Sequence, residues 1–572
     1  MRRPVIMSML AGVILTAGTL LGATPAPAVP AADGAARPAA AGSAEPPAEF
    51  GTDWHDPLTA APPVTKPATK SCRVTVAKAQ FRDFTPYRGT YTPVTGCGDR
   101  WSKVVLRLEG KVKGRQFDRL GYLHVGGVEI FRTSTPEPSP DGIEWSVEKD
   151  VTRYSDTFRH AGDVEMLIGN VVDDTYTGVI DVDVTLTFYA FEKSARPAAS
   201  GALAGSAAPA RPASVPDRVL TLENGMLTTP RNSERIVAEV YATGSGGGCE
   251  EYWYLTVPDA APYSCKAADG PYREVRIEVD GRLAGIAAPF PTVWTGGWSN
   301  PFLWYVIPGP RAFDIKPIEY DLTPFAGLLN DGRPHRVDVS VAGVPEGQSG
   351  WSTPVDVLVW QDAKRAHVSG ALTEVAAGDM ANSSVHTPGS EHRLDTEGGH
   401  RLTVAGYVDT SHGRVTTTVG RTLANTSVHR WTDGENTDAL TATWTDDERV
   451  TVDGRGPASV TRTHRTYTMD GTTTLGDGDR LRTVLTLGDR VAVDESRRGR
   501  PTAWSRSDDT YTGDATYTAN VPRDQRHAVA TTKERYRLLD PGVLLRGCLA
   551  GEHDRADEGG EEQDREGFEG EH

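Results

Sequence analysis

Alternation of apolar and polar residues with a period of two is the feature that most limits how this chain can fold. It runs through Val104–Val112 (VVLRLEGKV) and Ile180–Phe191 (IDVDVTLTFYAF), and it returns in Tyr272–Gly281, His335–Val341 and Pro354–Trp360. Such alternation is typical of strands that bury one face. No amphipathic helix of useful length interrupts it, so the sequence predicts an all-β protein.

Changes in composition divide the 572 residues into successive parts. We expect a signal peptide over residues 1–30, a disordered leader over 31–70, a first β-sandwich over 71–192, an Ala/Pro linker over 193–216, a second β-sandwich over 217–370, a further C-terminal β region over 371–548 and an acidic disordered tail over 549–572. The C-terminal region is rich in threonine and thin in apolar residues. We therefore expect it to form an accessory sandwich or an extended sheet packed on the rest.

A short motif, Asp-x-Thr-x-aromatic, occurs once in each of the two predicted sandwiches. It is DVTRY at Asp150–Tyr154 and DLTPF at Asp321–Phe325. The two regions also share the same alternating strands on either side of the linker. This parallel predicts two related sandwiches of about eight strands each, arranged in tandem.

The N-terminus has the pattern of a secretory signal. Arg2 and Arg3 precede an apolar run over Val5–Ala23, and Ala26–Ala28 (APA) resembles a signal peptidase site. We expect cleavage near Ala28 and a secreted protein. An uncleaved membrane anchor is the alternative, but the run is short and interrupted by glycine. No later segment has the roughly 18 apolar residues of a membrane span, so we expect no membrane association after cleavage.

Five cysteines are consistent with an oxidising compartment. Cys72 with Cys97, and Cys249 with Cys265, are close in sequence and fall in separate predicted domains, which makes them the favoured disulfide pairs. Cys548 is left over. No Cys/His cluster has the spacing of a metal site, and no dinucleotide or phosphate-binding motif occurs, so we expect neither metal nor cofactor.

The net charge of −17 argues against a nucleic-acid partner, because a basic excess is needed to displace counterions from phosphates. Much of this charge is local. Residues Glu552–His572 contain ten acids against two arginines. Such a run is usually disordered and solvated.

As a separate expectation, we predict that the protein is a monomer.

The segment Gly114–Pro138 predicts a β-hairpin. Two runs rich in Val, Ile, Tyr and Phe flank Gly126-Gly127, a dipeptide that adopts the positive φ angles of a tight hairpin turn. Continuing the alternation backwards places Asp118 on one face with Tyr122 and His124. Considered alone, Asp118 would be read as the partner of a neighbouring arginine.

The flanking motifs resemble those of the A-type peptide-N4-(N-acetyl-β-glucosaminyl)asparagine amidases, the secreted peptide N-glycanases. They are GCGDRW (Gly96–Trp101), GIEWSVEKDVTRY (Gly142–Tyr154), GGGCEEYWY (Gly246–Tyr254), TGGWSNPFLWYVI (Thr295–Ile307) and YDLTPFAGLLNDGRPH (Tyr320–His335). The resemblance covers roughly residues 71–370. It implies a pair of jelly rolls and hydrolysis of the amide bond between a glycoprotein asparagine and its innermost N-acetylglucosamine, giving aspartate and a glycosylamine. The implied partner is an N-glycopeptide or glycoprotein.

The resemblance also implies site residues. Phe117-Asp118-Arg119 looks like the aromatic-Asp-Arg triplet of the related F-type enzymes, so Asp118 is the expected catalytic acid of the first domain. Gly248–Tyr252 (GCEEY) matches the motif of the second domain and places the partner acid on Glu251, with Glu250 as the fallback. A third F-type acid aligns with Asn170, which is a departure: either Asn170 does the substrate-binding part of that role, or another acid such as Glu129 or Glu137 replaces it. The missing carboxylate also favours a carbohydrate-binding protein without turnover.

Amide hydrolysis without a metal needs a carboxylate that takes a proton from water and a second group that stabilises the developing oxyanion or protonates the nitrogen. Asp118 and Glu251 would divide these roles. Arg119, Asn170, Glu250, Tyr252, Trp294 and Trp298 are the expected substrate-binding residues.

Three alternatives remain open from the sequence. Glu250 and Glu251 could simply be solvated. The protein could bind carbohydrate without turnover, or it could be a glycosidase that uses the same two acids.

Overall fold

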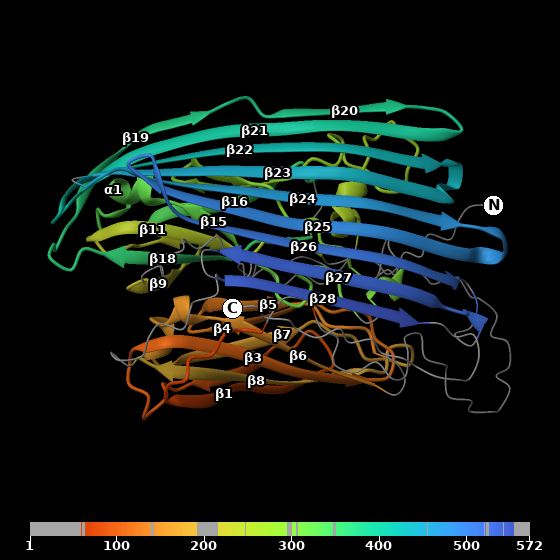
Figure 1. Cartoon of the computed structure of the whole chain (residues 1–572), viewed down its shortest axis with the longest axis horizontal. Coiled ribbons are helices and arrows are strands. Elements are labelled where there is room, and N and C mark those ends of the chain that lie inside the picture. The colour runs from red at the N-terminus through yellow and green to blue at the C-terminus, as the bar shows by residue number, and fades with distance from the viewer. Residues whose placement is uncertain are drawn as a thin grey trace, which may run out of the picture.

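The computed structural model of the protein describes residue 59 and residues 63–138, 142–191, 215–245, 248–294, 300–304, 307–346, 350–454, 456–519, 521, 525–540 and 543–553. The predicted signal peptide, almost all of the predicted linker and the tail beyond His553 lie outside these residues. Within them the protein is built from antiparallel strands, and the one α-helix, α1, spans only Ala326–Leu329 (Figure 1). None of the described helices has the length and apolar character needed to cross a membrane.

The first sandwich has the strand order of a jelly roll. One sheet has the order β1-β8-β3-β6 and the other β2-β7-β4-β5, which is the double Greek key of that fold. Its strands are β1 (Ser71–Phe81), β2 (Tyr87–Tyr91), β3 (Trp101–Lys113), β4 (Gly121–Val125), β5 (Val128–Thr133), β6 (Ile143–Asp150), β7 (Gly162–Ile168) and β8 (Val179–Ala190). The predicted hairpin is β4–β5, and Gly126 and Gly127 turn it with φ of 58° and 84°.

The second sandwich repeats this topology. Its sheets have the orders β10-β16-β13-β14 and β15-β11-β18-β9. The strands are β9 (Arg218–Thr221), β10 (Met226–Leu227), β11 (Ser233–Val240), β13 (Glu274–Val279), β14 (Arg282–Ala287), β15 (Ile318–Asp321), β16 (His335–Ala342) and β18 (Val355–Gln361). Numbered from β9 as one to eight, they pair as 1-8-3-6 and 2-7-4-5, the order of the first sandwich. The short pair β12 (Thr243–Gly244) and β17 (Trp351–Ser352) lies outside this count.

The repeated Asp-x-Thr-x-aromatic motif makes the same hydrogen bonds in both sandwiches. It follows the sixth strand, where the aspartate accepts the N–H of the threonine at 3.0 Å in each copy. The threonine Oγ1 then accepts a backbone N–H from the third strand, Val104 in one copy and Ile236 in the other. The aromatic residues Tyr154 and Phe325 are buried beneath the turn. The predicted internal repeat is therefore confirmed.

The C-terminal region forms one ten-stranded sheet rather than a sandwich, the second of the two predicted possibilities. Its strands are β19 (Ser369–Ala377), β20 (Ala381–Thr387), β21 (Glu391–Thr410), β22 (Gly413–Thr432), β23 (Thr437–Asp453), β24 (Ser459–Leu475), β25 (Arg480–Arg497), β26 (Arg500–Thr518), β27 (Val529–Asp540) and β28 (Val543–His553). The last strand continues past residue 548 into the predicted tail. In the view of Figure 1 the long strands extend along the length of the molecule, above the strands of the first sandwich.

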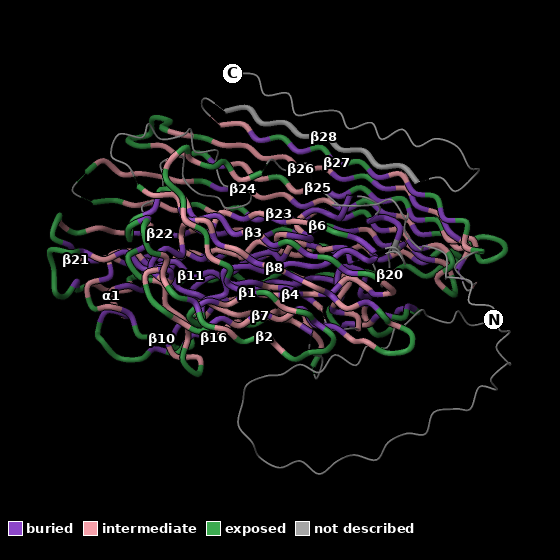
Figure 2. Tube along the Cα trace, turned by 90° about the horizontal axis from the view of Figure 1, so that it is seen from below, coloured by how far each residue is buried: buried purple, intermediate pink, exposed green. Residues whose placement is uncertain are grey.

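One face of this large sheet contributes to the cores of the other two modules. Trp431, Trp444 and Tyr511 join the core that contains the first sandwich, and Leu402 and Leu423 join that of the second. Buried residues alternate with half-buried or exposed ones along much of the long strands, and buried residues gather toward the middle of the molecule (Figure 2). Threonine, which suits a strand and tolerates water, occupies much of the other face.

The interface between the two sandwiches is buried and strongly polar. Arg153 reaches Glu239 and Glu319 at 2.6 Å each, Tyr154 donates to Glu239 at 2.7 Å, and the N–H of Glu129 donates to Asp356 at 3.0 Å. The register places Glu319, Glu239 and Asp356 side by side on three neighbouring strands. Burial and the carboxylates of Glu129 and Glu239 raise the pKa of Asp356 well above its usual value.

We expect Asp356→Asn to stabilise the protein at neutral and alkaline pH. At low pH the side chain is protonated in both the folded and the unfolded state, so its burial costs no free energy of ionisation. As the pH rises from the ordinary Asp pKa of about 3.9 through the raised pKa of the folded state, the free energy of unfolding falls. The neutral amide avoids that loss, and each kcal/mol relieved should raise Tm by about 2–4 °C. Thermal melts from about pH 4 to about pH 8 should show a gain that grows with pH. The control Asp259→Asn, at an exposed residue between β12 and β13, should show no such trend, and a constant difference for Asp356→Asn would contradict the assignment.

Candidate active site

Asp118 lies in the segment between β3 and β4, and its side chain is half-buried. We expected it to share a strand face with Tyr122 and His124. This was wrong, because β4 begins only at Gly121 and Asp118 precedes it in irregular backbone. His124 instead lies 3.5 Å from Glu129. Asp118 is therefore presented by a loop rather than by the hairpin.

Arg119 fixes this loop from the inside. Its backbone N–H donates to Thr135 Oγ1 at 2.9 Å, and its Nε and Nη2 donate to Gln116 Oε1 at 3.1 and 2.6 Å. Burial lowers the pKa of Arg119, and the charge of the adjacent Asp118 opposes that shift. The guanidinium is only 6% exposed, so Arg119 supports Asp118 from within, whereas the sequence had predicted a substrate contact.

The residues on either side of Asp118 in the chain, Phe117 and Arg119, both contact the ring of Tyr176. Phe117 and Tyr176 have centroids 5.0 Å apart, and both residues are half-buried. An Asx turn holds Tyr176 in place, because Asp173 Oδ1 accepts the N–H groups of Thr175 and Tyr176 at 2.7 Å each. Sugar rings present C–H groups that pack on aromatic faces, so this pair is suited to line a sugar site.

Glu251 lies on the 3₁₀ helix η3 (Cys249–Leu255), which begins after Gly248 in a left-handed conformation with φ of 107°. The side chains of Glu251 and Tyr252 are half-buried. Burial, with Glu251 as the second cause, raises the pKa of Tyr252. The backbone departs from helical angles at Tyr252, where ψ is 48°.

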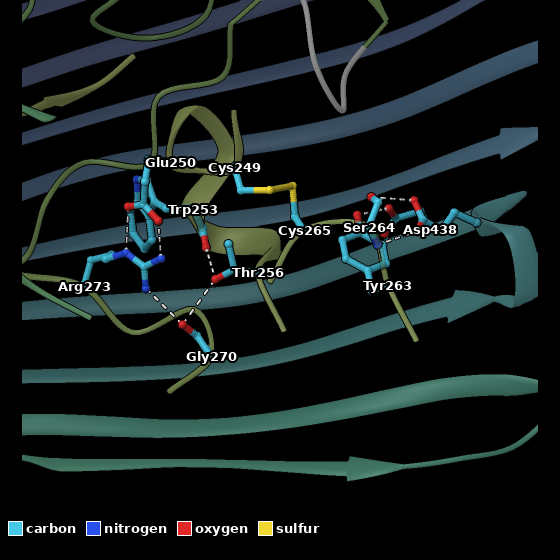
Figure 3. Close-up of a disulfide and its surroundings, with 11 residues drawn as sticks. Cys249, Glu250, Trp253, Thr256, Tyr263, Ser264, Cys265, Gly270, Arg273 and Asp438 are labelled. Atoms are coloured by element: carbon cyan, nitrogen blue, oxygen red, sulfur yellow. Dashed lines mark hydrogen bonds and ion pairs between the residues drawn. A yellow bond between two sulfur atoms is a disulfide. The ribbon is translucent and has the colours of Figure 1, made fainter. Parts of the chain in front are cut away.

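Glu250, the neighbour of Glu251, points into the protein. Arg273 donates to its two oxygens at 3.0 and 2.6 Å, and Trp351 Nε1 donates at 2.6 Å (Figure 3). Glu250 is 2% exposed. Its carboxylate is engaged in an internal ion pair, so the expectation that it contacts substrate is not met, and Glu251 is the acid that η3 presents.

A disulfide and the large sheet hold η3 from its other side. The predicted pairs Cys72–Cys97 and Cys249–Cys265 are both formed. Beside the second pair, Tyr263 donates to Asp438 at 2.6 Å (Figure 3). The ring of Trp253 in η3 contacts Trp444 of β23, with centroids 5.6 Å apart. The C-terminal region thus supports the loop that carries Glu251.

Asp118 and Glu251 occupy corresponding places in the two jelly rolls. Each lies between the third and fourth strand of its sandwich, β3 and β4 in one, β11 and β13 in the other. The sandwiches are joined where β5 reaches β12 and β17, since Arg132 of β5 donates to Thr243 and Ser352. The Asp118 loop is bonded to Thr135, two residues after β5, and η3 packs on Gly244 of β12, so both acid-bearing loops are attached to elements of this junction.

Two other predicted substrate contacts are corrected. Asn170 is fully buried, and its Nδ2 donates to the carbonyls of Phe81 and Gly178 at 2.9 and 3.1 Å. Trp294 is 6% exposed and donates to the carbonyl of Gly244 at 3.2 Å. Both side chains are used internally because their polar groups complete hydrogen bonds that the buried backbone needs. Trp298 lies outside the described residues.

The candidates for a third acid are also buried. Glu129 is 1% exposed and forms an ion pair with Arg132 at 2.6 Å. Glu137 is 3% exposed and lies near Arg119 and Tyr517, whose pKa values it influences. Neither presents an open carboxylate to solvent. Asp118 and Glu251 therefore remain the two half-buried acids of the candidate site.

One group in the described part of the chain has the ligand types of a metal site. Glu234, Asp362 and His412 offer atoms within 4.8 Å of one another. Asp362 already accepts hydrogen bonds from Ser411 and from the N–H of Lys364. This group includes neither acid of the candidate site.

Sequence reasoning missed the residues that support the two acids. Gln116 and Thr135 hold Arg119, the Tyr176 ring lies beside the Arg119 guanidinium, and Arg273 binds Glu250. Gln116 and Thr135 gave no signal because neither belongs to a motif. Arg273 lies just before β13, after an aromatic residue. Its role could have been predicted only from knowing that a buried acid lies nearby.

The comparisons with known proteins agree with this description. A family model described as peptide N-acetyl-beta-D-glucosaminyl asparaginase amidase A matches residues 61–377. A protein of Prunus dulcis, peptide-N4-(N-acetyl-beta-glucosaminyl)asparagine amidase A, is 30% identical over 387 residues, covering 62% of this chain and 66% of that protein. The chain thus spans slightly less than two thirds of that relative.

Two solved structures are more distant. PNGF-II is 13% identical, covers 51% of this chain and 65% of its own, and has a TM-score of 0.33. The PBSX exported protein XepA is 11% identical, covers 50% of this chain and 86% of its own, and has a TM-score of 0.13. Neither likeness is close enough to carry an argument about fold or function.

We expect the adjacent acids of η3 to respond differently to removal. Glu250→Ala leaves the buried guanidinium of Arg273 without its counter-charge, which should lower the free energy of unfolding by about 3–5 kcal/mol. Glu251→Ala should change it by less than about 1 kcal/mol, because that side chain is partly solvated. Urea denaturation of both variants measures the difference. Equal losses would mean that the two carboxylates have similar environments.

Proposed function

Because the chain belongs to the peptide N-acetyl-beta-D-glucosaminyl asparaginase amidase A family, we propose that it hydrolyses the amide bond between a glycoprotein asparagine and the innermost N-acetylglucosamine. The products are an aspartate in the peptide and a glycan released as its glycosylamine. The substrate is an N-glycopeptide or an N-glycosylated protein. The reaction is that of an amidase, so it differs from a glycosidase in breaking a C–N bond.

The observation that carries this proposal is the matched placement of Asp118 and Glu251. They are half-buried acids in corresponding loops of two joined jelly rolls. Glu250, the neighbour of Glu251, and Glu129 on β5 are instead engaged in buried ion pairs. The structure therefore separates acids that maintain the fold from acids that remain accessible in part.

In the proposed reaction, a water molecule attacks the side-chain carbonyl carbon of the substrate asparagine. Asp118 accepts a proton from that water as the new C–O bond forms. Glu251 stabilises or orients the reacting amide by accepting a hydrogen bond from its N–H. The C–N bond then breaks as the nitrogen takes the proton that Asp118 had accepted, the glycosylamine leaves, Asp118 is again a carboxylate, and the carboxylic acid formed on the peptide ionises.

Secretion completes the proposal. The N-terminal sequence pattern supports export, and the two disulfides are consistent with an oxidising compartment. Glycoproteins with N-linked glycans are found in the same environment. The monomeric state expected from the sequence stays a prediction.

The alternative of a binding protein without turnover drew part of its support from Asn170, which lacks a carboxylate. The Asn170 amide is internal and bonded to backbone carbonyls. Its identity therefore has no bearing on substrate chemistry, and the alternative loses that support. A glycosidase would be recognised by its product, since it would leave a sugar on the peptide.

We expect Asp118→Asn to lower the turnover of a defined N-glycopeptide by at least about a hundredfold, the usual contribution of a general base. Mass spectrometry should show conversion of the glycosylated asparagine to aspartate with the unaltered protein and not with the variant. Asp163→Asn, an exposed change on the same sandwich, is the control and should keep full turnover. Undiminished turnover by Asp118→Asn would reject Asp118 as the base.

We expect Tyr176→Ala to raise KM about tenfold, equivalent to about 1.4 kcal/mol of binding, while kcat changes less. Tyr176→Phe keeps the ring and should restore most of the affinity. Tyr189→Ala removes a half-buried tyrosine elsewhere on the same sandwich and serves as the control. Steady-state kinetics on a glycopeptide decide the matter, and an unchanged KM for Tyr176→Ala would exclude the ring from the sugar site.

A further inference from the structure

Arg132, near the end of β5, uses every donor that its side chain has. Nε and Nη2 donate to the Glu129 carboxylate at 2.6 and 3.0 Å. Nη1 donates to Thr243 Oγ1 at 2.8 Å and to the Ser352 carbonyl at 3.4 Å, and Nη2 also donates to Ser352 Oγ at 3.2 Å. An arginine carries five N–H groups, so none is left for a substrate. The residue is 1% exposed.

On the side of the second sandwich, Arg132 holds the platform on which η3 rests. Thr243 and Ser352 face each other in the β12–β17 pair, and the next pair is Gly244 with Trp351. Trp351 binds the carboxylate of Glu250. Gly244 approaches η3 so closely that a Cβ there would lie 2.2 Å from the Glu250 carbonyl oxygen. Arg132 therefore binds the residue pair of β12 and β17 that directly precedes the pair in contact with η3, the helix that carries Glu251.

On the side of the first sandwich, the chain leads from Arg132 directly to the loop of Asp118. Thr135 follows by three residues, a span of at most about 10 Å, and accepts the N–H of Arg119. Two backbone hydrogen bonds fix this stretch: Ile315 donates to the Arg132 carbonyl at 3.0 Å, and Ser134 donates to the Ala312 carbonyl at 2.8 Å. The same short segment therefore anchors both acid-bearing loops.

We propose that Arg132 is a positioning residue that sets the separation of Asp118 and Glu251 by fixing the β12–β17 platform to the segment that holds the Asp118 loop. The role of the two acids rests on the proposed function. The mechanical coupling of the two loops does not, because it follows from the contacts alone. A lysine cannot replace this arginine, since it carries three donors on a single nitrogen and cannot bridge Glu129, Thr243 and Ser352 at once.

The test compares Arg132→Lys with Arg153→Lys in the full chain. Arg153 also joins the two sandwiches in a buried ion pair, but its acceptors lie on β11 and β15. We expect Arg132→Lys to lower kcat on a glycopeptide by about a hundredfold with little change in KM, because misplaced catalytic groups impair the transition state more than binding. Arg153→Lys should lower Tm and keep kcat. Equal kcat values for the two variants would overturn the proposal.

A second readout does not depend on turnover. Amide hydrogen exchange should increase in residues 114–121 and in residues 248–256 of Arg132→Lys, and in neither segment of Arg153→Lys. Thr243→Val, which removes one acceptor and keeps the side-chain shape, should raise exchange in 248–256 to a smaller extent. Unchanged exchange in both segments of Arg132→Lys would overturn the coupling. Absence of turnover by the unaltered protein would instead reject the proposed function and leave the exchange result to decide the role of Arg132.

Discussion

A guanidinium removed from water must replace every hydrogen bond that it loses, and the junction of the two sandwiches is built around this requirement. Arg132 meets it with one carboxylate, two hydroxyls and a carbonyl that come from three strands. The residues around Arg132 can move little relative to one another, because each acceptor that moves away leaves a buried donor without a hydrogen bond. Directional hydrogen bonds therefore define the relative position of the two modules. An apolar interface would define it less closely, because apolar contacts have no preferred direction.

The duplicated jelly roll gives the molecule two equivalent loops with different supports. The Asp118 loop depends on Arg119, Gln116 and Thr135, all within the first sandwich. The Glu251 loop depends on a disulfide, on the buried pair of Glu250 with Arg273, and on the large sheet. Equivalent positions in a repeated fold thus acquired different local chemistry, which is what a site that needs two distinct acids requires.

The sequence predicted the features that depend on local pattern. Alternation identified the strands, Gly126-Gly127 marked the hairpin turn, and the spacing of the cysteines favoured the two disulfides that the structure contains. The repeated Asp-x-Thr-x-aromatic motif indicated the internal repeat. Each of these signals comes from residues that are neighbours in the chain, so it can be recognised without knowledge of the tertiary structure.

Predictions that depended on burial were less successful. Asn170 and Trp294 have polar groups that suit a ligand as well as they suit a backbone carbonyl, and only the packed structure shows which partner they have. Glu250 and Glu251 are adjacent, so no pattern distinguishes the acid bound to Arg273 from the acid that remains partly solvated. The start of β4 at Gly121 likewise depends on pairing with β7, which is distant in sequence.

The large sheet differs from the sandwiches in how its strands are connected. From β21 onward each strand pairs with the next one along the chain, whereas the first and last strands of a jelly roll are neighbours. A meander closes only short loops as it forms, while the jelly rolls must bring distant segments together before they gain contacts. Several aromatic residues of the sheet, Trp431, Trp444 and Tyr511 among them, belong to the core that contains the first sandwich. Pairing of the sheet's strands therefore closes only short loops, whereas full burial of these rings requires contact with another module.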